Sequence, residues 1–156
     1  MLKIRLIAVG KIRETYLKEG ISEYAKRISR YAELQIREVK EETFSKEGEA
    51  ERRAAKKKEG ERILAELKGA AVCLSAEGKK FSSEQFSRYL VQTGDRAGEI
   101  SFVIGGSYGL DDAVKARADL VLSFSDMIFP HGLMRLIFTE QLYRAFTIAE
   151  GGNYHK

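Results

Sequence analysis

Two segments near the C-terminal end of the chain have residue types that suit a binding site. The first is Ile104–Gly109, IGGSYG, where an apolar run ends in glycines, and the second is Leu122–Arg135, LSFSDMIFPHGLMR, which holds the only proline of the chain. Glycines allow a ligand to approach the backbone closely, and loops at strand ends are where α/β proteins usually bind ligands. We therefore expect both segments to contribute to one site.

The glycine-rich segment does not match the common phosphate-binding motifs. It lacks the lysine and Ser/Thr of a Walker loop, its glycines are not spaced as GxGxxG, and it comes late in the chain rather than after a first strand. Three interpretations stay open. The backbone amides could hold a phosphate, the segment could be a tight turn without a ligand, or the glycines could admit a flat ligand.

The loop after residue 123 is unusually apolar for a surface connection. Phe124, Met127, Ile128 and Phe129 follow one another closely, and we expect them to line a pocket or an interface rather than to remain in water. Backbone donors and acceptors in such a loop would suit an adenine ring and a methionine-like chain.

Charged residues interrupt the apolar segment that follows this loop. Glu140 and Arg144 have the i, i+4 spacing of a helical ion pair. Arg135 lies in the same segment, where an unpaired buried charge would be costly, so these charges either satisfy each other or serve catalysis or a dimer contact. His131, next to Pro130, is either a structural hydrogen-bonding group or a group that handles a proton.

The chain ends in Tyr154-His155-Lys156. A frayed terminus is the ordinary interpretation of such a tail. The combination of aromatic and basic side chains also suits a clamp that stacks on RNA bases and contacts phosphates.

Hydrophobic periodicity predicts the elements that must position these residues. Strands are expected at 3–9, 34–39, 70–74, 100–104 and 120–124, and helices at 13–30, 45–68, 82–94, 111–118 and 133–149. The alternation predicts an α/β fold with a mostly parallel sheet and helices on both faces. The last helix is apolar nearly all round, so we expect it to be central or to be covered by another chain.

Several boundaries of these elements follow from local signals. Ser82 and Gln85 have the spacing of a capping box at a helix start, and this helix is expected to stop near Gly94. Gly69 is where a C-cap glycine is expected for the helix that begins at Ser45. The sequence SAEGKK, 75–80, is expected to be a turn after the third strand.

Length and composition indicate a single domain, 1–156, of a soluble cytoplasmic protein. No apolar run approaches the ~20 residues of a membrane helix, and the N-terminus lacks the layout of a signal peptide. Two histidines far apart in sequence give little support for a metal site. Cys73 is the only cysteine and lies in an apolar run, which suggests a buried thiol.

The net charge of +4 is mildly basic. Basic residues gather in 11–31 and again in the cluster Arg52, Arg53, Lys56, Lys57, Lys58. Such clusters are either solvated surfaces or contacts to the phosphate backbone of a nucleic acid. Charge alone leaves both interpretations open.

Six segments in a fixed order resemble one family. They are LIAVGK, CLSAEGK, VIGGSYGL, LSFSDMIFPHGLMR, EQLYRAF and the final YHK, and the resemblance that they carry covers the chain from residue 2 to the last residue. They are similar to the small SPOUT-superfamily methyltransferases of large-subunit (23S) ribosomal RNA, the RlmH family. The resemblance implies transfer of a methyl group to N3 of a pseudouridine in the helix 69 stem-loop, on assembled ribosomes.

The resemblance also implies a fold, a cofactor and an assembly. The C-terminal segment is expected to form a trefoil knot that binds S-adenosyl-L-methionine, and the protein is expected to act as a homodimer. The cofactor-contacting positions of the family correspond here to Leu74, Gly105, Phe124, Ser125, Asp126, Met127, Ile128 and Phe129.

We further hypothesise that five residues surround the target base, with the tail supplied by the partner subunit: His131, Arg135, Arg144, Tyr154 and His155. Which group accepts the proton of N3 stays open. A non-enzymatic ribosome-binding factor with the same fold is the alternative function, and a nucleotide- or flavin-binding protein of flavodoxin type is a further one.

Overall fold

Strands and helices alternate along the chain, as the periodicity predicts. The computed structural model describes residues 1–43, 46 and 48–156. Within these residues the elements are β1 (Leu2–Val9), α1 (Thr15–Ile28), β2 (Ala32–Val39), α2 (Glu49–Glu66), β3 (Ala70–Lys80), α3 (Ser83–Ala97), β4 (Glu99–Ile104), α4 (Asp112–Arg117), β5 (Leu120–Ser123) and α5 (His131–Ala149).

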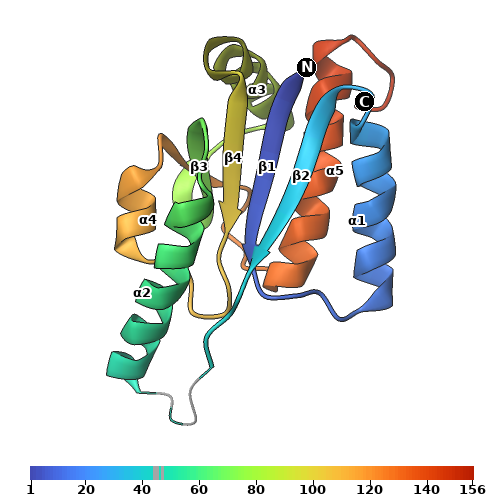
Figure 1. Ribbon diagram of the computed structural model, residues 1–156. Coiled ribbons are helices and arrows are strands. Elements are labelled where there is room, and N and C mark those ends of the chain that lie inside the picture. Colours follow the sequence, from blue (N-terminus) through green and yellow to red (C-terminus); the bar gives the residue numbers. More distant parts are fainter. Residues whose placement is uncertain (44–45, 47) are drawn as a thin grey trace.

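The strands form one parallel sheet in the order β2-β1-β4-β3-β5. Helices α1, α3 and α5 cover one face and α2 and α4 the other (Figure 1). The predicted α/β architecture, with helices on both faces of a parallel sheet, is therefore confirmed.

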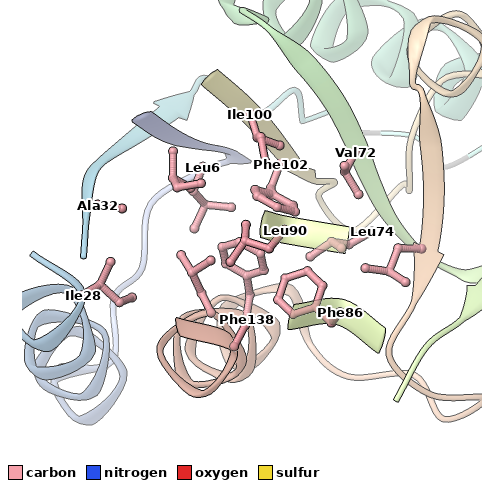
Figure 2. Close-up of a cluster of buried hydrophobic side chains, with 14 of the residues drawn as sticks. Leu6, Ile28, Ala32, Val72, Leu74, Phe86, Leu90, Ile100, Phe102 and Phe138 are labelled. Carbon is pink, nitrogen blue, oxygen red and sulfur yellow. The ribbon is translucent and has the colours of Figure 1, made fainter. Parts of the chain in front are cut away.

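The larger part of the core lies under α1, α3 and α5. Phe102 of β4 packs against Phe138 of α5 and Phe86 of α3, with ring centroids 4.8 and 6.0 Å apart (Figure 2). Alternate residues of the same strands face α2 and α4, among them the buried Cys73, whose thiol has a pKa raised to about 11 by burial. Both faces are covered, which explains why these strands are apolar without alternation.

Neighbouring strands β3 and β4 send the chain to opposite faces of the sheet. The chain leaves β3 for α3 and leaves β4 for α4, which lie on different faces (Figure 1). A sheet with such a reversal has a crevice at the carboxyl ends of the two strands, because neither connection fills the space between them. The fold therefore provides a binding position where the glycine-rich segment begins.

The segment 75–80 is strand, not the turn that the sequence indicates. After a register shift between Leu74 and Lys79, the end of β3 pairs with β5, with Lys79 opposite Leu122. Gly78 lies directly on β5: a Cβ at this position would be 2.6 Å from the carbonyl carbon of Val121. The turn-like composition thus reflects a need for small residues where the two segments make close contact.

The boundaries of two helices also differ from the prediction. Helix α3 continues through Gly94 to Ala97 and ends at Gly98, which has the left-handed conformation; its capping box of Ser82 and Gln85 is confirmed. Helix α2 ends at Glu66 with Leu67 as its C-cap, so Gly69 is not the capping residue. Gly69 has a φ of 71°, in the left-handed region that favours glycine, and a Cβ there would also lie 2.0 Å from the carbonyl oxygen of Glu99. The predicted start at Ser45 lies outside the described residues.

A buried guanidinium attaches the first turns of α5 to the sheet. Arg135 is 2% exposed. Its Nη2 donates to the carbonyl oxygens of Val9 and Gly10, at 2.9 and 2.7 Å, and its Nη1 donates to Glu38 Oε2 at 2.7 Å. These acceptors lie at the carboxyl ends of β1 and β2. Because a buried charge is tolerated only with such partners, the arginine fixes where α5 begins.

The trefoil knot stays a prediction. The pairing of the end of β3 with β5 and the position of α5 between α1 and α3 are compatible with it. A short segment connects β5, at one edge of the sheet, to α5, which packs against both α1 and α3.

Replacing Gly78 with alanine should destabilise the fold. The added methyl would meet backbone atoms of β5, which cannot rotate away, so we expect a loss of about 1–3 kcal/mol in the free energy of unfolding. Gly94→Ala is the control, because its methyl would meet only the flexible tip of Leu2 and alanine favours the helix. Urea unfolding of both variants provides the measurement; equal stabilities would contradict the close crossing.

Arg135→Ala should lower the free energy of unfolding by about 3 kcal/mol, because it leaves two buried carbonyls and Glu38 without their donor. Arg27→Ala removes an exposed ion pair with Glu23 and exposed cation–π contacts with Tyr24 and Tyr143, and should change stability by no more than about 1 kcal/mol. Urea unfolding with both variants compares the two. A small effect at Arg135 would show that it does not anchor α5.

Candidate functional site

A cleft of about 640 Å³ lies at the carboxyl ends of β4 and β5, beside the middle of β3. This volume is within the range of small-molecule sites in proteins. Its walls come from the middle of β3, the glycine-rich segment, the loop after β5 and the first turn of α5. The lining residues are Leu74, Ser75, Ala76, Ile104, Gly105, Gly106, Ser107, Gly109, Leu110, Leu122, Phe124, Ser125, Met127, Ile128, Phe129, Pro130, His131 and Met134.

Most residues expected to contact a cofactor lie around this cleft. The lining includes Leu74, Gly105, Phe124, Ser125, Met127, Ile128 and Phe129. Asp126 does not line the cleft: its side chain is 79% exposed and forms an ion pair with Lys80, Oδ2 to Nζ 2.5 Å. The structure thus brings seven of the eight positions together.

The loop between β5 and α5 has a defined internal structure. Ser123 Oγ donates to the carbonyl of Ser125 at 2.9 Å, and Ser125 Oγ accepts from the amide of Met127 at 2.9 Å. The ring of Phe124 packs edge-on against Phe86, with ring centroids 5.8 Å apart. These contacts fix the loop at its start and keep its backbone close to the cleft.

The tip of the same loop is more exposed than its composition predicts. The side chains of Met127 and Ile128 are 73% and 86% exposed. We expected the apolar side chains of this loop to be shielded from water. Phe124 and Phe129 are partly buried at the cleft, whereas Met127 and Ile128 at the tip are exposed. Two large apolar side chains in water suggest an interaction surface.

The glycine-rich segment is a tight turn and also a wall of the cleft. The amide of Gly109 donates to the carbonyl of Gly106 at 3.1 Å, and Gly109 has a φ of 84°. A Cβ at Gly105 would be 3.0 Å from Leu110 Cδ2. The segment thus has the geometry of a tight turn, and the missing side chains leave its backbone accessible to a flat molecule.

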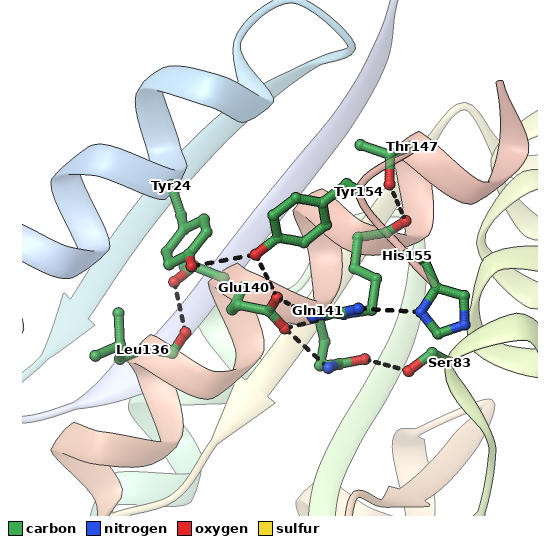
Figure 3. Close-up of polar contacts among 10 residues, drawn as sticks. Tyr24, Ser83, Leu136, Glu140, Gln141, Thr147, Tyr154 and His155 are labelled. Atoms are coloured by element: carbon green, nitrogen blue, oxygen red, sulfur yellow. Dashed lines mark hydrogen bonds and ion pairs between the residues drawn. The ribbon is translucent and has the colours of Figure 1, made fainter. Parts of the chain in front are cut away.

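A second polar cluster lies around the C-terminal half of α5 (Figure 3). Arg144 donates to both oxygens of Glu140, at 3.3 and 2.8 Å, and Glu140 raises the pKa of the guanidinium. The hydroxyl of Tyr154 donates to Glu140 Oε2 at 2.7 Å and lies 3.3 Å from the hydroxyl of Tyr24. Burial, with these two hydrogen bonds, raises the pKa of Tyr154, so its phenol stays protonated at neutral pH.

His155 completes this cluster. Its Nδ1 lies 3.0 Å from Arg144 Nη1, and its Nε2 lies 2.6 Å from Glu84 Oε1. A guanidinium can only donate, so Nδ1 is the acceptor and Nε2 carries the hydrogen that is donated to Glu84. The bond from His155 lowers the pKa of Glu84. Both ring nitrogens are therefore occupied.

The five residues expected around a target base lie in three places within one chain. His131 lines the cleft, and Arg135 is buried between α5 and the sheet. Arg144 is 13 residues beyond His131 on the same helix, which at a rise of about 1.5 Å per residue separates them by about 20 Å. Tyr154 and His155 fold back on their own chain beside Arg144. A single chain does not bring these side chains together.

Some residues of the polar cluster were not found from the sequence. Gln141 accepts from Ser83 Oγ at 2.7 Å and donates to Glu140 Oε1 at 2.9 Å, and Tyr24 and Glu84 come from α1 and α3. Gln141 is adjacent to Glu140 and could have been included with it. Tyr24 and Glu84 have no local signal, because only packing of α1 and α3 against α5 places them here.

The described part of the chain shows neither a cluster of metal ligands nor a helix that could span a membrane. Among residues 1–43, 46 and 48–156, no three side chains of His, Cys, Asp or Glu are grouped as metal ligands would be. Over the same residues, no helix combines the length and apolar character needed to cross a bilayer.

Solved structures with a similar fold include methyltransferases. A probable methylase family protein from Haemophilus influenzae Rd KW20 matches with a TM-score of 0.55 and 14% identity, over 98% of this chain and 70% of that one. A putative methyltransferase from Legionella pneumophila, in complex with the bound cofactor SAM, matches with a TM-score of 0.53 and 14% identity, over 92% and 66%. At this identity the likeness concerns the fold.

Curated relatives match over their entire length. The Ribosomal RNA large subunit methyltransferase H of Streptococcus thermophilus strain CNRZ 1066 is 48% identical over 99% of this chain and 100% of the relative. The proteins of the same name from Streptococcus suis strain 05ZYH33 and Streptococcus pneumoniae strain CGSP14 are 45% and 46% identical, with the same coverage. The family described as "Predicted SPOUT methyltransferase" matches residues 2–155. The chain therefore belongs to the SPOUT methyltransferase family.

Proposed function

We propose that this protein uses S-adenosyl-L-methionine to methylate N3 of a pseudouridine in the helix 69 stem-loop of large-subunit ribosomal RNA. We further propose that residues 1–156 act as one domain and that the substrate is the assembled ribosome. The observation that supports this most is the full-length match to relatives named as large-subunit ribosomal RNA methyltransferases, at 45–48% identity. A non-enzymatic ribosome-binding factor is not favoured, since the family is one of methyltransferases.

The cleft fits the proposed cofactor in size and chemistry. It is largely apolar, as an adenine ring and a thioether chain require, and the side chains of Leu74, Phe124 and Phe129 form part of its lining. The backbone at Gly105 and along the loop 124–129 would supply the polar contacts. Asp126 would contribute through its backbone, because its side chain is directed to Lys80.

The chemical demands on the protein are modest. Bound S-adenosyl-L-methionine supplies a methyl group that its sulfonium already activates. The chain must hold the acceptor nitrogen in line and exclude water, and removal of the N3 proton should help by about 10²–10⁴-fold. The side chains of this protein are therefore needed mainly to position the acceptor nitrogen and to accept the proton of N3.

We propose His131 as the proton acceptor. It lines the cleft and has no hydrogen-bond partner among the described residues. Tyr154 is held protonated by burial and by its hydrogen bonds, and both ring nitrogens of His155 are occupied. Arg144 remains charged and is suited to a phosphate or a base carbonyl. Arg135 acts as a positioning residue, because it holds the helix that carries His131.

We also propose that two copies form the active unit. Leu133 and Ile137 are only half-buried on α5, and the tip residues Met127 and Ile128 of the preceding loop are exposed. A two-fold interface uses the same surface from both copies. If two α5 helices pack antiparallel through their first halves, Arg144 and the tail of one copy approach the cleft of the other. Such a dimer would unite residues that one chain keeps about 20 Å apart.

His131→Ala should reduce methyl transfer by about 10²-fold or more while cofactor binding persists, because it removes the proton acceptor. Transfer from labelled cofactor to intact ribosomes, isolated subunits and naked RNA is measured, and the modified nucleoside is mapped. Calorimetry with S-adenosyl-L-methionine is the binding control. Unchanged rates in the variant would exclude His131 as the acceptor, and absence of transfer by the unmodified protein would exclude the proposed function.

A mixture of two inactive variants should recover activity if the site is shared between copies. His131→Ala and Arg144→Ala each disable both sites of their own dimer. After exchange of subunits, each mixed dimer contains one site with neither substitution, so roughly a quarter of the original activity should return. If Arg144 instead serves the cleft of its own chain, the mixture stays inactive. Deletion of Tyr154–Lys156 mixed with His131→Ala gives the same test for the tail.

A further inference from the structure

The first half of α2 carries positive charge that is not neutralised within the described residues. Arg52, Arg53 and Lys57 are exposed, and none of them forms an ion pair with a described acidic side chain. Farther along the same helix the situation differs: Lys58 and Arg62 both pair with Glu42, at 4.0 and 2.9 Å. The unpaired charge is therefore confined to the beginning of the helix.

The acidic residues nearby have another role. Glu49 and Glu51 lie in the first turn of α2, where a carboxylate stabilises the helix through its dipole. The carboxylate of Glu51 is folded back over Gly48 at the N-cap. It is thus directed away from the arginines that follow, which keep their charge toward solvent.

The start of α2 also extends beyond the sheet. The buried residues of this helix begin only at Ala55 and continue with Glu59, Gly60 and Ile63. Figure 1 shows the beginning of α2 projecting past the carboxyl ends of the strands, the edge at which the cleft lies. The first turns of α2 therefore do not pack on the sheet and have no apolar face, so their surface is available to a partner.

Further exposed basic residues lie along the same edge. Lys11 and Arg13 follow β1, and Lys40 follows β2. All three border one hollow at the carboxyl ends of these strands, where Lys18 adds a fourth positive charge and Glu38 and Glu41 supply two negative ones. Together with the start of α2 they place positive charge on the side of the molecule where a substrate would enter the cleft.

The chemistry of this surface favours a polyanion. Between residues 49 and 58 the only apolar residues are alanines, so the surface lacks the aromatic and large aliphatic side chains that dominate protein–protein interfaces. Arginine and lysine side chains in solvent are the usual contacts to phosphate groups of nucleic acids. The surface would hold a strand without reading its sequence.

We propose that the start of α2, with Lys11, Arg13 and Lys40, binds the phosphate backbone of the RNA that flanks the target nucleotide. This inference rests on the proposed function, because it assigns the surface that holds the RNA substrate while the base enters the cleft. Its contribution is electrostatic, so it weakens as salt concentration rises.

The double variant Arg53→Ala/Lys57→Ala tests this surface. These residues are one helical turn apart and exposed, so the substitutions should not disturb folding. Binding to a stem-loop of large-subunit ribosomal RNA is followed by fluorescence anisotropy from about 50 to 200 mM salt. The slope of log K against log salt should become shallower by about 2, one for each lost phosphate contact.

Arg88→Ala/Arg96→Ala is the matched control. It removes the same charge from two exposed positions of α3, away from the cleft, and should leave the salt slope within about 0.5 of the unmodified protein. Equal losses in the two variants, no change in the α2 variant, or no RNA binding by the unmodified protein would each overturn the proposal.

Failure of the proposed function can be recognised separately. Calorimetry with S-adenosyl-L-methionine should give the same affinity for both double variants, since neither pair lines the cleft. With saturating RNA the α2 variant should transfer methyl groups at the rate of the unmodified protein, and only the RNA concentration for half-maximal rate should rise. Transfer that does not occur at any RNA concentration in the unmodified protein refutes the function rather than the surface.

Discussion

The contact of Arg135 with the ends of β1 and β2 is the interaction on which the site depends. Its guanidinium joins α5 to two backbone carbonyls and to Glu38. The two terminal nitrogens of this buried guanidinium are paired at this edge, whereas its Nε has no partner among the described residues. A shift of the helix start would break these bonds and leave the charge and the carbonyls unpaired. His131 lies one turn earlier on α5, so its place at the cleft follows from this contact.

Small residues provide the second condition for the cleft. Gly78 lets the end of β3 run directly over β5, and the glycines at 105 and 106 leave backbone exposed at the end of β4. The register shift in β3 lets the same strand pair with β5 both before and after Gly78. The cleft is therefore formed where side chains are absent, as well as by the apolar side chains that line it.

Electrostatic pairing explains how the polar cluster on α5 is arranged in one chain. Glu140 accepts from Arg144, Tyr154 and Gln141, and His155 joins Arg144 to Glu84. The tail is therefore an ordered part of the chain rather than the frayed end that its position suggests. In the proposed dimer, this ordered cluster would face the cleft of the other copy, so the two halves of the site would be assembled by symmetry.

Much of the fold could be predicted from local patterns. Apolar periodicity located the strands and helices of the described chain, because segments that are buried on one or both sides have a characteristic pattern of apolar residues. The exceptions were places where a local signal has two physical causes. Glycine at 78 is required by close packing against β5, and glycine at 69 by both a left-handed backbone and close packing against β4, whereas glycine in a sequence is ordinarily interpreted as a turn or cap.

The cleft residues were predicted better than the residues proposed to act on the substrate. Seven of the eight positions expected to contact the cofactor line one cleft. Those in the loop 124–129 are neighbours in any fold, whereas Leu74 and Gly105 meet there because β3 and β4 are adjacent in the sheet. The burial of Arg135, the pairing of His155 with Glu84 and the distance of Arg144 from His131 depend on how α1, α3 and α5 pack. The sequence by itself determined the alternating elements, the apolar loop and the family; only the tertiary structure decided which charges are buried, paired or exposed, because these depend on residues far apart in the chain.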